Sequence, residues 1–138
     1  MKTPAAEIPL SPPGLKLARF WYLLGGLMLL LVGFVSLMPV PDTGVNDKFS
    51  HLVTYFILGG WFGLLAASRV SLGWTIVGLI AYGMLIELLQ GMTTHRYAEW
   101  ADVLANTGGT MAGILLYFST LPRLLRLVDR KLALLWLR

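Results

Sequence analysis

The sequence contains no cysteine among its 138 residues, and only 13% of its residues are charged. The missing cysteines exclude disulfide bonds, thiolate catalysis and cysteine-ligated metal sites. Soluble domains carry about 25% charged residues, and a short soluble chain has too much surface to bury a composition that is 57% hydrophobic. These scarcities argue against a soluble globular enzyme, and the same apolar composition argues against a disordered chain.

The sequence contains four long apolar runs. They cover residues 20–38, 49–68, 70–86 and 103–122, and the third pattern continues past Glu87 to Leu89. A membrane-spanning helix needs about 20 mainly apolar residues, and apolarity all around each run argues against a soluble bundle. The sequence therefore predicts an all-α polytopic membrane protein built as a four-helix transmembrane bundle. The first run is too long for a signal-peptide core and lacks a small-residue cleavage pattern.

The chain divides into three segments. Residues 1–16 hold four prolines and are predicted to be a mobile tail, and residues 17–122 form the transmembrane domain, in which Ser71 is expected to cap the third helix. In residues 123–138, Arg123, Arg126 and Arg130 recur on one side of a helix, opposite leucines. This pattern predicts a basic amphipathic helix on the anionic lipid of the inner leaflet. The alternative is a straight continuation of the fourth helix.

The basic residues predict the orientation. Nine of the eleven Lys and Arg residues fall in the N-terminal tail, the link after the second run and the C-terminal segment, and two fall on the other side. Positively charged loops stay in the cytoplasm. We therefore expect both termini inside, and the links at about residue 45 and residue 95 outside.

This topology gathers the polar residues of the helices at the outer side of the membrane. At 100° per residue, Asp47, His51 and Tyr55 share a face of the second helix, and Asp102 and Asn106 share a face of the fourth. We predict one ligand-binding site from nine residues. They are Asp47, Lys48, His51, Tyr55, Glu87, Gln90, Arg96, Asp102 and Asn106.

Glycine pairs on the same two helices support this convergence. Gly59 with Gly63, and Gly109 with Gly113, each form a G-x-x-x-G spacing. Such pairs permit a neighbouring helix to approach closely. The second and fourth helices are therefore predicted to pack tightly beneath the polar residues.

Three of the nine residues, Glu87, His51 and Asp102, are candidate acid/base groups. A carboxylate among apolar residues requires a cation or a proton, and we predict Arg96, rather than Lys48, as the closer partner of Glu87.

Structural alternatives stay open for these residues. His51 could simply pair with Asp47 one turn earlier, and Glu87 with Gln90 could bridge to a neighbouring helix. Asp102 could cap the fourth helix, and Asn106 could link two helices.

Other kinds of functional site have little support in the sequence. A metal site from His51, His95, Glu87 and Asp102 is chemically feasible, but no motif gives the ligand spacing, so no metal and no cofactor is predicted. The sequence has no G-x-S-x-G elbow and no glycine-rich nucleotide loop. Because the basic residues lie beside the membrane, nucleic-acid binding is not expected.

Several of these motifs together resemble a known family. They are Asp47-Lys48-Phe49-Ser50-His51 with Tyr55, Gly83 with Ile86-Glu87-Leu88-Leu89-Gln90, and Arg96 followed by Trp100, Asp102-Val103-Leu104-Ala105-Asn106 and Gly109. Over residues 45–115 the chain resembles the VanZ-like membrane proteins, named after a teicoplanin-resistance protein. The resemblance implies a small multi-span protein of the bacterial cytoplasmic (inner) membrane, with a role in the cell envelope and in glycopeptide-antibiotic susceptibility, but it supplies no reaction.

The leading functional hypothesis is a membrane protein that binds an envelope lipid, a lipid-linked envelope precursor or its headgroup in an outer-leaflet polar pocket. The second is a membrane enzyme that acts on a lipid-linked phosphate or ester. The third is a purely structural helix-bundle subunit whose polar cluster fixes packing.

Overall fold

The computed structural model describes residues 14–39, 46–93 and 97–136. Every element in these ranges is helical, which confirms the all-α class. The elements are α1 (Ala18–Leu37), α2 (Asp47–Leu65), α3 (Arg69–Gly91), α4 (Trp100–Ile114), the 3₁₀ helix η1 (Leu115–Phe118) and α5 (Leu121–Trp136). Most of the proline-rich tail, residues 1–13, lies outside the described residues.

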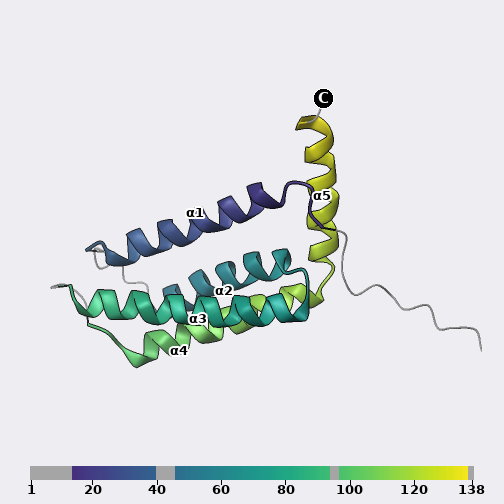
Figure 1. Cartoon of the computed structure of the whole chain (residues 1–138). Coiled ribbons are helices and arrows are strands. Elements are labelled where there is room, and N and C mark those ends of the chain that lie inside the picture. Colours follow the sequence, from purple (N-terminus) through teal and green to yellow (C-terminus); the bar gives the residue numbers. More distant parts are fainter. Residues whose placement is uncertain (1–13, 40–45, 94–96, 137–138) are drawn as a thin grey trace, which may run out of the picture.

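The first four helices run side by side in alternating directions, and α5 stands across one end of them (Figure 1). That end holds the start of α1, the end of α2 and the start of α3. The chain bends by 71° between the Trp100–Phe118 segment and α5. The bend favours a separate C-terminal helix over a straight continuation of α4.

Two helices, α1 and α3, are long and apolar enough to cross a membrane, and the bent pair of Trp100–Phe118 with Leu121–Trp136 makes three if it counts as one span. The helix α2 is not among them, because Asp47, Lys48 and His51 in its first turns lower its hydropathy. The described part of the chain is therefore all-helical with two to three candidate membrane spans, a coarser result than the predicted four.

The fourth predicted run, 103–122, is not one continuous α-helix. The α-helix ends at Ile114, the chain continues as η1 to Phe118, and Ser119 has an extended backbone with ψ of −172°. The leucines and aromatics of the run continue through this break, so hydropathy alone does not reveal it.

The helix α1 makes few contacts with the rest of the fold. Its described side chains are mostly exposed, with Leu23 74% and Leu30 73% accessible, and only Trp21 and Gly25 are buried. A patch of leucines of this extent is unfavourable in water and suits the acyl chains of a lipid bilayer.

The helices α2 and α4 have the most extensive contact in the described fold. A Cβ atom on Gly109 would lie 2.2 Å from the backbone oxygen of Leu52, and one on Gly113 would lie 2.2 Å from that of Phe56. In the other direction, a Cβ atom on Gly59 would lie 2.6 Å from the oxygen of Thr110. The glycine pairs therefore bring the two backbones together, as their spacing predicts.

The start of α3 differs from the sequence prediction. Its N-cap is Ser68, whose hydroxyl accepts from the backbone N–H of Ser71 at 3.1 Å, and the Ser71 hydroxyl accepts from the N–H of Ser68 at 3.0 Å. Ser71 is thus the third helical residue of a capping box rather than the cap itself.

A buried carboxylate joins the last helix to the first. Asp129 of α5 accepts hydrogen bonds from the backbone N–H groups of Lys16 at 2.6 Å and Leu17 at 2.9 Å, and from Trp21 Nε1 at 2.8 Å. Burial would raise the pKa of Asp129, but these three donors outweigh burial and hold its pKa below the usual value. Asp129 therefore caps α1 with a negative charge, which complements the positive end of the helix dipole.

Candidate functional site

His51 lies at the centre of the polar residues. It is on the second turn of α2, only 8% exposed, and its Nδ1 lies 3.0 Å from Oδ1 of Asn106 on α4. Asp47, one turn earlier on α2, places Oδ2 3.8 Å from His51 Nε2. Asn106 therefore bridges two helices, and Asp47 lies close enough to His51 for the alternative pairing within α2.

Two buried carboxylates face the same imidazole from other helices. Glu87 of α3 is 3% exposed and places Oε1 3.8 Å from His51 Nδ1. Asp102 of α4 is 4% exposed and places Oδ2 3.9 Å from His51 Nε2. The three candidate acid/base residues thus come together from α2, α3 and α4, although they are far apart in the sequence.

Lys48 supplies a cation at the outer rim of this group. Its Nζ lies 2.8 Å from Asp102 Oδ1 and also forms an ion pair with Glu99. Glu99 is a residue that the predicted site omits, and its backbone N–H donates to Glu87 Oε2 at 3.4 Å. A loop position just before α4 has no periodicity that would mark it as a site residue.

Asp102 does not cap α4. The N-cap is Glu99, and Asp102 lies three residues inside the helix, with its oxygens directed to Lys48 and toward His51. The capping interpretation of Asp102 is therefore wrong, and its buried position serves contacts with α2.

Among the described residues of the predicted site, Gln90 is turned away from the group. Gln90 is directed to α1, where its Nε2 donates to the backbone oxygen of Ser36 at 2.9 Å. Arg96 lies outside the described residues, so its pairing with Glu87 stays a prediction.

Polar atoms continue below His51, between α2, α3 and α4. The hydroxyl of Tyr55 and the Nδ2 of Asn106 both lie 3.2 Å from the point where a Cβ atom on Gly83 would stand. Within the described part of the chain, these two atoms and the hydroxyl of Thr110 are buried and have no hydrogen-bond partner. Buried donors of this kind are normally satisfied by a ligand or an ordered water.

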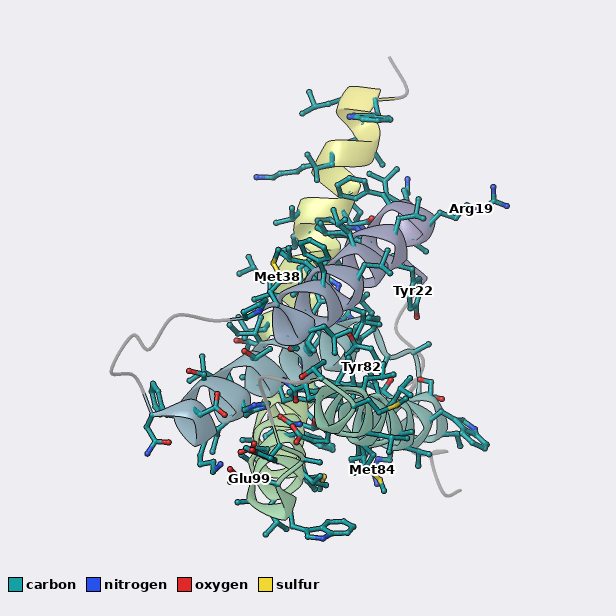
Figure 2. All side chains as sticks on the ribbon, turned by 90° about the vertical axis from the view of Figure 1, so that its left-hand side faces the viewer. Arg19, Tyr22, Met38, Tyr82, Met84 and Glu99 are labelled. Carbon is teal, nitrogen blue, oxygen red and sulfur yellow. The ribbon has the colours of Figure 1, made fainter. Side chains whose placement is uncertain are left out.

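An apolar groove of about 410 Å³ opens beside this group of residues, between α3 and α4. Its lining is Met84, Leu85, Glu87, Leu88, Ala98, Glu99, Trp100 and Val103. Glu87 and Glu99 belong both to the groove and to the polar residues, and Met84 and Glu99 lie on the side of the fold away from α1 (Figure 2). An amphipathic molecule could therefore contact apolar and polar side chains at once.

We use the name polar cluster for Asp47, Lys48, His51, Glu87, Glu99, Asp102 and Asn106. The histidine of the polar cluster is held by an amide on one side and faces carboxylates on the other. Such an arrangement can orient a proton acceptor, bind a cation or hold hydroxyl groups.

A comparison with protein families gives a match that covers the polar cluster and most of the chain. The family model described as VanZ/LLP1 matches residues 16–125, a range that contains α1 to α4, η1 and the first turn of α5. No curated protein and no solved structure matches the chain.

Proposed function

Because the chain belongs to the VanZ/LLP1 family, we propose that it is a four-span protein of the bacterial cytoplasmic membrane that binds an envelope lipid through the polar cluster. The observation that carries the proposal is the apolar groove between α3 and α4 that leads to Glu87 and Glu99. Small-molecule sites are typically apolar clefts with a few polar groups that orient the ligand. The lipid tail would lie in the groove and the headgroup at the polar cluster.

The buried donors explain how a headgroup would be held. Hydroxyl or ester oxygens of a headgroup could accept hydrogen bonds from the Tyr55 hydroxyl and from Asn106 Nδ2, two atoms that have no hydrogen-bond partner among the described residues. Each buried donor left without a partner costs about 1–3 kcal/mol, so satisfying two of them favours binding. A role in glycopeptide-antibiotic susceptibility would follow if the bound lipid is an envelope precursor.

The proposed topology places this site on the outer side, with α5 on the anionic lipid of the inner leaflet. Exposed leucines along α5, among them Leu124, Leu127 and Leu135, would enter the headgroup region. We expect a reporter enzyme that is active only outside the cytoplasm to work when fused after Thr93, and to be inactive when fused after Arg138. Immunoblots of cell lysates measure the amount of each fusion protein, so that the two reporter activities are compared at equal expression. The reversed pattern would place the polar cluster on the cytoplasmic face and refute an outer-leaflet ligand.

Filling the groove tests lipid binding directly. We expect Val103→Trp to reduce the lipid that co-purifies with the protein, read by native mass spectrometry, by at least about tenfold, because the indole would occupy the space of an acyl chain. The matched control is Val77→Trp on α3, which is 57% exposed and does not line the groove. Equal lipid on both variants, with unchanged circular dichroism, would contradict the proposed site.

A second candidate function rests on the orientation of His51. The hydrogen bond to Asn106 fixes the imidazole, and Asp102 faces its other nitrogen, which is the geometry of an oriented general base. An enzyme acting on a lipid-linked phosphate or ester would show product masses in the same spectra. A purely structural subunit would show neither bound lipid nor product.

A further inference from the structure

A second kind of ligand fits part of the polar cluster. One oxygen of Asp47, Nε2 of His51 and one oxygen of Asp102 all lie within 4.8 Å of one another. His51 and Asp102 are buried, whereas Asp47 is exposed and leaves the group open to the outside. We propose that Asp47, His51 and Asp102 bind a divalent transition-metal cation of the Zn²⁺ class.

The first argument is the tautomer of His51. Because Asn106 Oδ1 only accepts hydrogen bonds, His51 Nδ1 at 3.0 Å must carry the proton. The other ring nitrogen, Nε2, faces Asp47 Oδ2 at 3.8 Å and Asp102 Oδ2 at 3.9 Å. One ring nitrogen and two carboxylate oxygens that face one another form the kind of N/O donor set that binds a metal cation.

The hydrogen bond to Asn106 is itself typical of metal sites. A metal-binding histidine donates its second ring N–H to a carboxylate, a carbonyl or water, and this contact fixes the ring and the tautomer. The amide oxygen of Asn106, which is 2% exposed, provides that contact. The described residues give Nε2 no hydrogen bond, so this nitrogen is available for a metal.

Asp102 uses its two oxygens for different purposes. Oδ1 lies 2.8 Å from Lys48 Nζ, while Oδ2 is turned to His51. The ion pair with Lys48 therefore fixes the carboxylate in the orientation that a metal would require, and one oxygen stays directed at the cation position.

The distances suit a small cation after a slight contraction. Zn–N and Zn–O bonds are about 2.0–2.2 Å, so two ligands in tetrahedral geometry lie roughly 3.4 Å apart. The N–O separations of 3.8 and 3.9 Å need to shorten by a few tenths of an ångström, and the carboxylate oxygens of Asp47 and Asp102, which lie within 4.8 Å of each other, need to approach to the same separation. One imidazole and two carboxylates form a mixed N/O donor set that suits Zn²⁺, Fe²⁺ or Mn²⁺ better than Ca²⁺. Three protein ligands leave a coordination position open.

The sequence predicts no metal because the ligands lie on two helices. Asp47 and His51 are four residues apart on α2, a common pattern by itself, and Asp102 comes from α4. The metal site does not depend on the proposed lipid binding, and each can fail without the other.

The experiment is a Zn²⁺ titration of the full chain, purified in detergent and treated with chelator, with no added lipid. Calorimetry should show one Zn²⁺ per chain, and Co²⁺ in its place should give visible absorption bands. Asp47→Asn removes one ligand at the exposed end and should weaken Zn²⁺ binding at least about tenfold, as should His51→Ala. Circular dichroism checks that both variants are folded.

The matched control is His95→Ala, which removes the only other histidine of the sequence and should leave Zn²⁺ binding unchanged. The proposal is overturned if the unaltered chain binds no Zn²⁺, or if Asp47→Asn binds it as well as the unaltered chain does. Lipid counts on the same samples separate this result from the fate of the proposed function.

Discussion

Replacing Gly109 by alanine is expected to destabilise the chain by about 3 kcal/mol or more, the upper end of the cost of overpacking. The new Cβ atom would lie 2.2 Å from the backbone oxygen of Leu52 and 2.9 Å from the backbone nitrogen of Phe56. Both atoms belong to the backbone of α2, so no side chain can rotate away. The two helices would have to separate. Unfolding in mixed micelles with increasing SDS measures the loss.

The control for this prediction is the neighbouring residue. A Cβ atom on Gly108 meets nothing within 4 Å, so Gly108→Ala should be neutral or stabilising by up to about 1 kcal/mol, because alanine favours a helix. Equal stability of the two variants would mean that α2 and α4 do not approach as closely as described. Because Asn106 is on α4 and His51 on α2, Gly109→Ala should also weaken ligand binding at the polar cluster.

Replacing Asp129 by asparagine is expected to lower the free energy of unfolding by about 2 kcal/mol, the size of hydrogen bonds to a charged group. An amide has one acceptor oxygen where the carboxylate has two, and its NH₂ would face the N–H of Lys16 or Leu17. The start of α1 would lose its cap. Arg130→Gln, the adjacent and exposed position of α5, should change stability by less than about 0.5 kcal/mol.

The pH dependence of Asp129 gives an independent test. Its pKa in the folded chain is lowered relative to the unfolded chain, so its contribution is complete above the usual carboxyl pKa of about 3.9. The contribution is lost as the pH falls through the lowered folded-state value. The difference in melting temperature between the unaltered chain and Asp129→Asn should be constant from neutral pH down to about pH 5, and shrink at more acidic pH. A difference that persists unchanged to the lowest pH would show that the carboxylate charge is not what holds α1.

Hydropathy predicts the helices well where a run ends at a clear signal. The predicted run 20–38 matches α1, which ends at Leu37 just before Pro39, and the run beginning at 70 matches α3. It fails after Ile114, because the switch from α-helix to η1 changes hydrogen bonding and not composition. The predicted C-terminal helix begins at residue 123, whereas α5 begins at Leu121.

The polar cluster could be predicted because burying a carboxylate in a helix is costly, which marks Glu87 and Asp102 from the sequence alone. Helical periodicity then placed His51 and Asn106 on matching faces. The pairing within the group depends on side-chain rotamers and on the packing of α2 against α4, so the sequence does not predict the contacts of Lys48 with Glu99 and of Gln90 with Ser36.

The contacts of Asp129 show most clearly what cannot be predicted from the sequence. An acidic residue on a basic helix is typical of a solvated surface, and its actual partners include backbone N–H groups at residues 16 and 17. Backbone groups have no sequence signature, so no pattern in the sequence connects residue 129 with residue 16.

The bond between Asp129 and the start of α1 also sets an order of events during biosynthesis. Lys16 and Asp129 are 113 residues apart, and ribosomes add about 5–20 residues per second. The first helix is therefore made on the order of 10 s before its cap exists. During this interval its first N–H groups must be solvated by water or headgroups at the membrane surface. Asp129 can bind the backbone of residues 16 and 17 only after the last helix has been made. A product that stops before residue 129 would therefore keep an uncapped first helix, which quality-control proteases can recognise.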